Sequence, residues 1–416
     1  MRFQSLGISP ELARAAGDFG FIDPTPVQSA AIPVVLTGAD LLASAQTGSG
    51  KTAAYALPLL QGLQQLVGPR RRAVQALVLV PTRELAAQVG ELLRSLAQPL
   101  ARPVSIAVVF GGVSINPQMM GLRGGADVVV ATPGRLLDLV TQNAVKLDAV
   151  RLLVLDEADR LLDLGFADEL QRVLALLPAQ RQNLFFSATF PPAVEGLANG
   201  MLHSPVRVKV AAAGGREPAI AQRVIQVDEK RRTELLRRLI AEEKWERVLV
   251  FVATQYAAEH VAWKLHKAGI FATPFHGGMS QGARSKVLAD FKSGGWDVVV
   301  TTDLAARGID IAQLPVVVNY DLPRSAVDYL HRIGRTGRAG ASGLAVNFVS
   351  AAAEAHMRLL ETRQRLQLPR EQVAGLEPTE VAPPAIEGAG AGGVKGKRPS
   401  KKDKLRAAAI KAAGTP

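Results

Sequence analysis

Residues 41–52 read Leu-Leu-Ala-Ser-Ala-Gln-Thr-Gly-Ser-Gly-Lys-Thr, and this stretch decides the fold. The apolar run 41–44 predicts a buried strand, and residues 53–66 predict a helix. A glycine-rich turn ending in Gly-Lys-Thr between a strand and a helix is typical of a phosphate-binding loop, because backbone N–H groups and the helix N-terminus both favour anions. We therefore predict that this loop binds the phosphates of a nucleotide.

Within the loop, Lys51 is expected to reach the β- and γ-phosphates, and Thr52 to bind Mg²⁺ directly. Ala45 stands where the general pattern has its first glycine. The predicted cofactor-binding set of the loop is Ala45, Gln46, Thr47, Gly48, Ser49, Gly50, Lys51 and Thr52.

A second element of the site is acidic. The apolar stretch 152–155 predicts a strand, and Asp156-Glu157-Ala158-Asp159 follows it. Carboxylates at the carboxyl end of a parallel strand face the crevice where such sheets bind ligands. Asp156 is expected to hold the water shell of Mg²⁺, and Glu157 to orient and deprotonate the attacking water. The alternative is a solvated acidic turn with no catalytic role.

Outward from these motifs, short runs rich in Val, Leu and Ile alternate with amphipathic stretches along the whole chain. The runs are continuous, as in strands buried on both faces of a parallel sheet, and the alternation predicts an α/β doubly wound fold. It breaks near residue 205 and then restarts. We therefore predict a first domain at 1–208, a linker at 209–219, a second domain at 220–370 and a disordered, Ala/Gly/Pro-rich and then basic tail at 371–416.

The composition limits the functional classes. The 416 residues carry a net charge of +12, which suggests a polyanionic partner such as nucleic acid. The stretch 388–416 holds eight Lys or Arg and one Asp, so it is either an RNA-binding tail or a solubilising end. There is no cysteine, which excludes disulfides and thiolate metal sites. No long apolar run or signal core appears, so we expect no membrane span and a cytoplasmic location.

The second domain offers no phosphate-binding loop, since 251–255 reads Phe-Val-Ala-Thr-Gln. It carries instead His-Arg-Ile-Gly-Arg-Thr-Gly-Arg at 331–338. Arg332, Arg335 and Arg338, spaced by three, are expected to stabilise the charge that develops on a transferring phosphoryl group. The alternative is a generic basic patch. If the first reading holds, hydrolysis depends on closure of the two domains.

These motifs together resemble the DEAD-box RNA helicases over residues 3 to about 350. The stretches that carry the resemblance are Phe3 with the Q motif 20–28, the loop 45–52, Pro-Thr-Arg-Glu-Leu at 81–85, Gly111-Gly112, Thr-Pro-Gly-Arg at 132–135, Asp-Glu-Ala-Asp at 156–159, Ser-Ala-Thr at 187–189, Val-Phe-Val at 250–252, 302–310 and 331–338. Residues 110–117 and 143–147 look most like the bacterial RhlE-type subgroup.

The resemblance implies two RecA-like domains in tandem and a role for each motif residue. Gln28 would read the adenine edge and Phe21 would stack on adenine, while Gly308 and Asp310 would lie at the nucleotide, with Asp310 on the ribose. The implied catalytic set is Lys51, Asp156, Glu157, Ser187, Thr189, His331, Arg335 and Arg338, in which Ser187 and Thr189 link the nucleotide state to closure and His331 bridges to the acidic box.

RNA is the implied partner, held by its backbone and therefore independently of sequence. The implied contacts are Arg83, Gly111, Thr132, Gly134 and Arg135 in the first domain, and Gly277 and Thr302 in the second. A preference for RNA over DNA comes from the resemblance alone. Ribosomal precursors and the RNA-degradation machinery are both open as partners, and the core is expected to be a monomer.

Three functions stay open at this point. The first is an ATP-dependent enzyme that locally separates short RNA duplexes or remodels RNA–protein complexes. The second is an ATP-gated clamp or annealing chaperone, in which unwinding is incidental. The third is a DNA translocase of related fold, against which the Q motif and the Ser-Ala-Thr motif argue. The complete catalytic set favours the enzyme.

Overall fold

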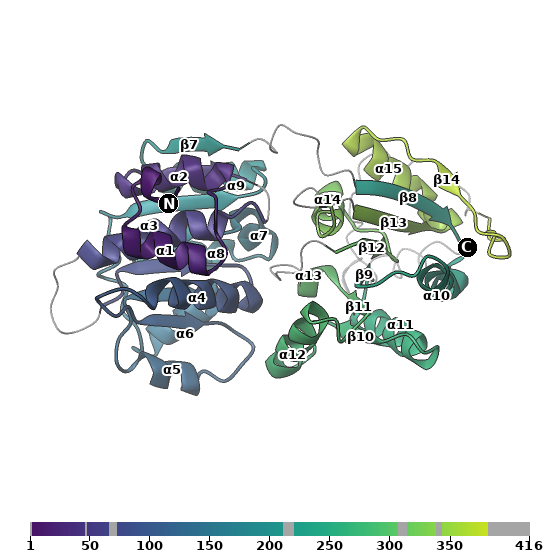
Figure 1. Cartoon of the computed structure of the whole chain (residues 1–416), viewed down its shortest axis with the longest axis horizontal. Coiled ribbons are helices and arrows are strands. Elements are labelled where there is room, and N and C mark those ends of the chain that lie inside the picture. Colours follow the sequence, from purple (N-terminus) through teal and green to yellow (C-terminus); the bar gives the residue numbers. More distant parts are fainter. Residues whose placement is uncertain are drawn as a thin grey trace, which may run out of the picture.

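The computed structural model describes residues 2–45, 48–65, 73–210, 220–306, 314–337 and 343–381. Within these ranges the strands form two sheets of seven parallel strands each, one after the other along the chain (Figure 1). The predicted fold class is confirmed. No helix in the described ranges has both the length and the apolar character to cross a bilayer.

The first sheet has the order β3-β4-β2-β5-β6-β1-β7, so the strand that leads into the phosphate-binding loop lies next to the strand that ends at Ser187. In spatial order the strands are β3 (Ile106–Val109), β4 (Val128–Ala131), β2 (Ala76–Leu79), β5 (Leu152–Leu155), β6 (Gln182–Ser187), β1 (Leu41–Ser44) and β7 (Val206–Lys209).

The helices of the first domain are α1 (Pro10–Asp18), α2 (Pro26–Leu36), α3 (Lys51–Gln65), α4 (Arg83–Ala97), α5 (Asn116–Leu122), α6 (Pro133–Thr141), α7 (Ala158–Asp163), α8 (Ala167–Ala175) and α9 (Pro192–Met201). They cover both faces of the sheet. On β2, Ala76 and Val78 belong to the core of one face, and Leu77 and Leu79 to the core of the other. This explains why the strands read as unbroken apolar runs.

The second sheet repeats the pattern with the order β10-β11-β9-β12-β13-β8-β14. Its strands are β10 (Ala272–Phe275), β11 (Val298–Thr301), β9 (Val248–Phe251), β12 (Val316–Asn319), β13 (Gly343–Val349), β8 (Ile220–Gln226) and β14 (Arg370–Glu371). The helices of this domain are α10 (Arg232–Glu242), α11 (Gln255–Lys267), α12 (Gln281–Lys292), α13 (Asp303–Ala306), α14 (Ala326–Ile333) and α15 (Glu354–Gln364). Figure 1 shows α12, α13 and α14 on the side turned toward the first domain.

Two predicted boundaries need correction. Lys209, assigned to the linker, is the last residue of β7, an edge strand that pairs with β1. Residues 371–381, assigned to the disordered tail, pack on the second domain: Leu376 is buried, and the backbone N–H of Thr379 donates to both carboxylate oxygens of Asp228. One buried leucine and one accepting carboxylate order a stretch whose composition alone suggested disorder. Residues 211–219 and 382–416 lie outside the described residues.

Candidate active site

The phosphate-binding loop holds polar atoms that have no hydrogen-bond partner. Lys51 begins α3 and is only 5% exposed, and its Nζ donates to no hydrogen-bond acceptor. Ser49 Oγ and Asp156 Oδ1 are buried and unsatisfied in the same way. Leaving a buried polar group without a partner is costly, so such atoms gathered at one loop indicate a site made for a polar ligand.

Gln28 is packed directly against this loop. Its Nε2 donates to the carbonyl oxygen of Gly50 at 3.1 Å, and its Oε1 accepts from the backbone N–H of Thr25 at 2.8 Å. Gly50 has φ +93°, and a Cβ there would come within 2.5 Å of Gln28 Nε2, so the close approach requires glycine. The amide of Gln28 still has one free N–H donor and one free lone pair, so it can also hydrogen-bond to the edge of a base.

Asp156 lies at the carboxyl end of β5 and accepts a hydrogen bond from the hydroxyl of Tyr55 at 2.9 Å. Burial raises the pKa of Asp156 to about 6, nearby Lys51 opposes the shift, and Glu157 adds to it. Tyr55 did not figure in the prediction. Its signal was its position four residues after Lys51, which places both side chains on one face of α3.

Glu157 is the N-cap of α7 and has φ +51°, a left-handed backbone conformation that is unusual for a glutamate. Its carboxylate is almost fully buried, and its Oε2 lies 3.3 Å from Nη1 of Arg160, itself only 2% exposed. Backbone strain of this kind persists where the surroundings hold a side chain in one place. Arg160 fixes the carboxylate of Glu157 in this way. Like Tyr55, Arg160 was not predicted from the sequence.

The last residue of the acidic box, Asp159, connects this site to the Ser-Ala-Thr motif. Its Oδ2 accepts from both the backbone N–H and the hydroxyl of Thr189, at 2.9 and 2.8 Å. The hydroxyl of Ser187 accepts from the N–H of Asp159 and donates to the carbonyl of Thr189. Ser187 and Thr189 are thus tied to the acidic box, as a link between the two motifs requires.

The second domain brings His331 to the acidic box. Burial, and after it the cation of Arg160, lower the pKa of His331 to about 4 against the opposing charges of Asp159 and Glu157. The imidazole is therefore neutral at neutral pH. Arg335 is only 7% exposed, and a small pocket between the domains is lined by Arg160 from one side and by Phe251, His331 and Arg335 from the other.

Arg332 does not have the predicted role beside a phosphate. Its guanidinium makes a bidentate ion pair with Asp303 at 2.6 and 2.7 Å and also donates to Asn319 and to the carbonyl of Asp321. The group lies over the ring of Phe251. All of these contacts are internal to the second domain, so Arg332 anchors α14. The spacing of three residues could not distinguish the role of Arg332 from that of Arg335, because the contacts of each side chain depend on how α14 packs.

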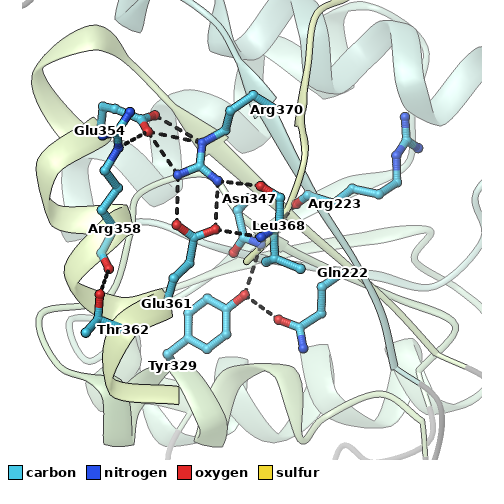
Figure 2. Close-up of polar contacts among 10 residues, drawn as sticks. All are labelled: Gln222, Arg223, Tyr329, Asn347, Glu354, Arg358, Glu361, Thr362, Leu368 and Arg370. Carbon is cyan, nitrogen blue, oxygen red and sulfur yellow. Dashed lines mark hydrogen bonds and ion pairs between the residues drawn. The ribbon is translucent and has the colours of Figure 1, made fainter. Parts of the chain in front are cut away.

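A further set of polar contacts, around Tyr329, holds the same face of α14 as Arg332 (Figure 2). The hydroxyl of Tyr329 donates to Gln222 at 2.8 Å and accepts from the amide of Asn347 at 3.0 Å. Burial raises the pKa of Tyr329 to about 12, so it stays protonated. Nearby, Arg370 joins Glu354 and Glu361 and ties β14 to α15. Together with Arg332, Tyr329 holds the helix that presents His331.

Three of the predicted RNA contacts of the first domain lie together. The N–H of Gly111 donates to the hydroxyl of Thr132 at 3.3 Å, and a Cβ at Gly112 would meet the guanidinium of Arg83 at 3.1 Å. Arg135 is 9% exposed and donates to the carbonyl of Val113 at 2.7 Å. Arg135 therefore shapes the 111–113 turn, and Gly134 is the neighbouring residue in the first turn of α6.

In the second domain, Gly277 follows β10 and lies beside the side-chain amide of Gln255, while Thr302 follows β11 and is 9% exposed. Phe21, the predicted adenine partner, is half-buried, and its ring lies 5.1 Å from that of the exposed Phe19. The remaining predicted site residues, Gln46, Thr47, Gly308, Asp310 and Arg338, lie outside the described residues.

The residues at the loop fit Mg²⁺. In the described residues no group of three or more His, Asp or Glu forms a metal cage. Mg²⁺ does not need one, since it is usually held by one or two carboxylates, several waters and substrate phosphates. The unsatisfied Oδ1 of Asp156 is such a carboxylate oxygen, and the side chain of Thr52, half-buried at the start of α3, offers a hydroxyl.

Comparison with known proteins shows the family to which the chain belongs. Residues 25–197 match the DEAD/DEAH box helicase family, and residues 231–340 match the helicase conserved C-terminal domain. The chain is 39% identical over 368 residues to the ATP-dependent RNA helicase CshA of Listeria monocytogenes, covering 88% of this chain and 70% of that protein. It is 41% identical over 375 residues to the ATP-dependent RNA helicase DeaD of Mycobacterium tuberculosis, covering 90% of this chain and 65% of that one.

Among solved structures, the chain is similar to Saccharomyces cerevisiae Dbp5 bound to RNA and ADP BeF3. The TM-score is 0.78 at 31% identity, over 89% of this chain and 95% of that chain. This chain thus shares its fold with Dbp5, and part of its sequence with all three proteins, over most of its length. The chain belongs to the DEAD-box ATP-dependent RNA helicases.

Proposed function

We propose that this protein hydrolyses ATP at a site completed by both domains, and that closure on RNA separates short duplexes locally or remodels RNA–protein complexes. One observation carries the proposal. Arg160 of the first domain and His331 and Arg335 of the second line one pocket, and the charge of Glu157, which follows the unsatisfied Asp156, acts on His331. A complete site therefore exists only when the domains are together.

The roles follow from these positions. Lys51 binds the terminal phosphates of ATP, and Asp156 with Thr52 would hold Mg²⁺, which would neutralise negative charge during hydrolysis. Glu157, fixed by Arg160, accepts the proton of the attacking water. Arg335 stabilises the charge that develops on the transferred phosphoryl group, and Arg338 is proposed to do the same. Gln28, Phe21 and Asp310 are proposed to hold adenosine.

RNA would lie across the two domains, on Arg83, Gly111, Thr132, Gly134 and Arg135 on one side and Gly277 and Thr302 on the other. These contacts address phosphate and sugar, so binding is independent of sequence. The relay from nucleotide to RNA runs through Asp159, because its carboxylate joins the acidic box to Thr189.

Finer assignments stay predictions. These are the RhlE-type subgroup, suggested by residues 110–117 and 143–147, a monomeric core, a cytoplasmic location, and a role in ribosome assembly or RNA turnover. The curated relatives reported above carry the names CshA and DeaD.

The test compares ATP hydrolysis by the full chain alone, with single-stranded RNA and with DNA of the same sequence. Stimulation by RNA but not by DNA is expected, together with separation of a short RNA duplex that requires hydrolysable ATP. Equal stimulation by DNA would favour a translocase. RNA held in an ATP-dependent way without turnover would favour the clamp.

A further inference from the structure

An exposed aromatic stripe runs along α11 of the second domain and has no part in the site described above. Tyr256 is 75% exposed and Trp263 is 53% exposed, and His260 lies between them. The rings of Tyr256 and His260 are stacked at 5.7 Å, those of His260 and Trp263 at 6.3 Å, and Lys267 Nζ lies 4.3 Å from the Trp263 ring centroid. From 256 to 267 the stripe is about 16 Å long at 1.5 Å per residue.

The stripe is not part of the core. The buried residues of α11 are Ala258, Val261, Ala262 and Leu265, which lie on the opposite side of the helix. In Figure 1, α11 lies at the lower edge of the second domain, with no element below it in that view. Large aromatic side chains exposed at helical spacing on a soluble surface indicate a contact with a partner.

A basic groove adjoins the stripe. A hollow of about 250 Å³ between α10 and α11 is lined by Lys230, Arg237 and Lys264 together with Thr233, Glu234 and Leu265. Lys264 lies four residues after His260, so the two are neighbours on the helix surface. No ion pair involves these three cations within the described residues, whereas the acidic Glu234 lies 3.6 Å from Arg231. The groove is therefore positive and open to an anion.

The N-terminal end of the stripe begins at the RNA contact proposed for the second domain. The amide of Gln255, the residue before Tyr256, lies 3.7 Å from the position that a Cβ on Gly277 would take. On the next turn of α11, Glu259 lies 3.1 Å from Nε2 of His276 and five residues before Lys264, so it is not a neighbour of Lys264 on the helix surface. A strand that leaves Gly277 would reach Tyr256 directly after Gln255.

We propose that this face of α11 binds single-stranded RNA beyond the proposed core contacts, with bases on the aromatic rings of Tyr256 and Trp263 and phosphates in the groove of Lys230, Arg237 and Lys264. Aromatic platforms beside a basic groove are the general means of holding single strands without sequence preference. At the roughly 3.4 Å spacing of stacked bases, the stripe has room for about five nucleotides. The inference rests on the proposed function, because it continues the same RNA path.

The test uses the full chain with a non-hydrolysable ATP analogue and two oligouridines, of about six and about twelve nucleotides, both within the range of single-strand sites. Replacing Tyr256→Ala and Trp263→Ala together should weaken binding of the longer oligomer about tenfold or more, since stacking on each ring contributes about fivefold or more. The shorter oligomer should bind as before. Tyr256→Phe with Trp263→Phe keeps the rings and should retain binding of both.

The charged half is tested separately. Lys230→Ala, Arg237→Ala and Lys264→Ala together should reduce the salt dependence of binding to the longer oligomer by about 2, at roughly 0.7 per phosphate on single strands. Leu359→Ala and Arg363→Ala on α15, also exposed, are the matched controls and should change neither value. If the unmodified chain binds neither oligomer, the proposed function fails. If it binds both and the α11 variants match it at both lengths, the α11 inference is overturned and the face is left to a protein partner.

Discussion

Arg284 of the second domain and Glu84 of the first form an ion pair of 2.7 Å across the cleft, and both side chains are buried. The same carboxylate oxygen of Glu84 accepts from Arg83, a predicted RNA contact, at 3.0 Å. Arg284 also lies over the ring of Phe275, one residue before the His276-Gly277 turn. The carboxylate of Glu84 thus connects the contact between the domains to predicted RNA contacts in both domains.

Arg284→Ala should lower RNA-stimulated hydrolysis about tenfold while leaving nucleotide affinity unchanged, because the ion pair with Glu84 that it removes joins the two domains. Adding Glu84→Ala should cost little more, since paired residues give non-additive effects. Arg238→Ala is the control, because its 2.6 Å pair with Glu242 lies within α10 and does not join the two domains. Fully additive losses in the two single variants would show that the pair does not couple the domains.

Glu157→Gln preserves the shape of the side chain and removes the base. Turnover should fall by at least about 10²-fold, a typical contribution of a general base, while ATP binding persists. Lys51→Ala should weaken binding as well, because Lys51 is the phosphate contact. Turnover by Glu157→Gln near that of the unmodified chain would assign the base to another group.

The pKa of Asp156, about 6, predicts that Mg²⁺-dependent nucleotide binding weakens at acidic pH. Protonation removes the ligand charge, so affinity should fall as pH drops through about 6, approaching tenfold per pH unit. The Tyr55 hydroxyl stabilises the carboxylate, so Tyr55→Phe should raise the pKa and move this limit to higher pH. Tyr320→Phe, a buried tyrosine of the second domain, should leave it in place. A midpoint unmoved by Tyr55→Phe would contradict the assignment.

Arg332 and Arg335, three residues apart, should separate stability from catalysis. Arg332→Ala should lower the free energy of unfolding of the second domain by about 2–4 kcal/mol, less than a fully buried pair because Asp303 keeps some solvent. Arg335→Ala should severely reduce RNA-stimulated hydrolysis, since Arg335 lines the pocket between the domains. Unchanged stability of Arg332→Ala, or unchanged hydrolysis by Arg335→Ala, would contradict the two assignments.

Residues 388–416 hold eight Lys or Arg and no aromatic residue, so contacts made there should be electrostatic. A chain ending at Val381 keeps the packed segment around Leu376 and removes these charges. If about three to five of them engage phosphates, the log–log salt dependence of RNA affinity should decrease by about 2–3.5. Turnover at saturating RNA should barely change. An unaltered salt dependence would leave this stretch as a solubilising end.

Much of the fold and of the candidate site was predictable because both rest on local signals. The stretch 41–52 combines an apolar run with a glycine-rich turn, and parallel strands place residues such as Asp156 and Ser187 at one edge of a sheet. The edge strand β7 and the segment 371–381 were missed because their order comes from neighbours: β1 pairs with the first, and Asp228 holds the second.

The sequence alone determined the fold class, the family and the chemical types in the site, because these depend on periodicity and on residue order. Tertiary structure alone decided which charged side chains pair with one another. The spacing of Arg332 does not reveal that its guanidinium forms an ion pair with Asp303 inside the second domain. Glu157 acquires its buried partner Arg160, and Glu84 meets Arg284 from 200 residues away. Burial and ion pairing depend on how distant segments pack, and the spacing of residues along the chain does not predict that packing.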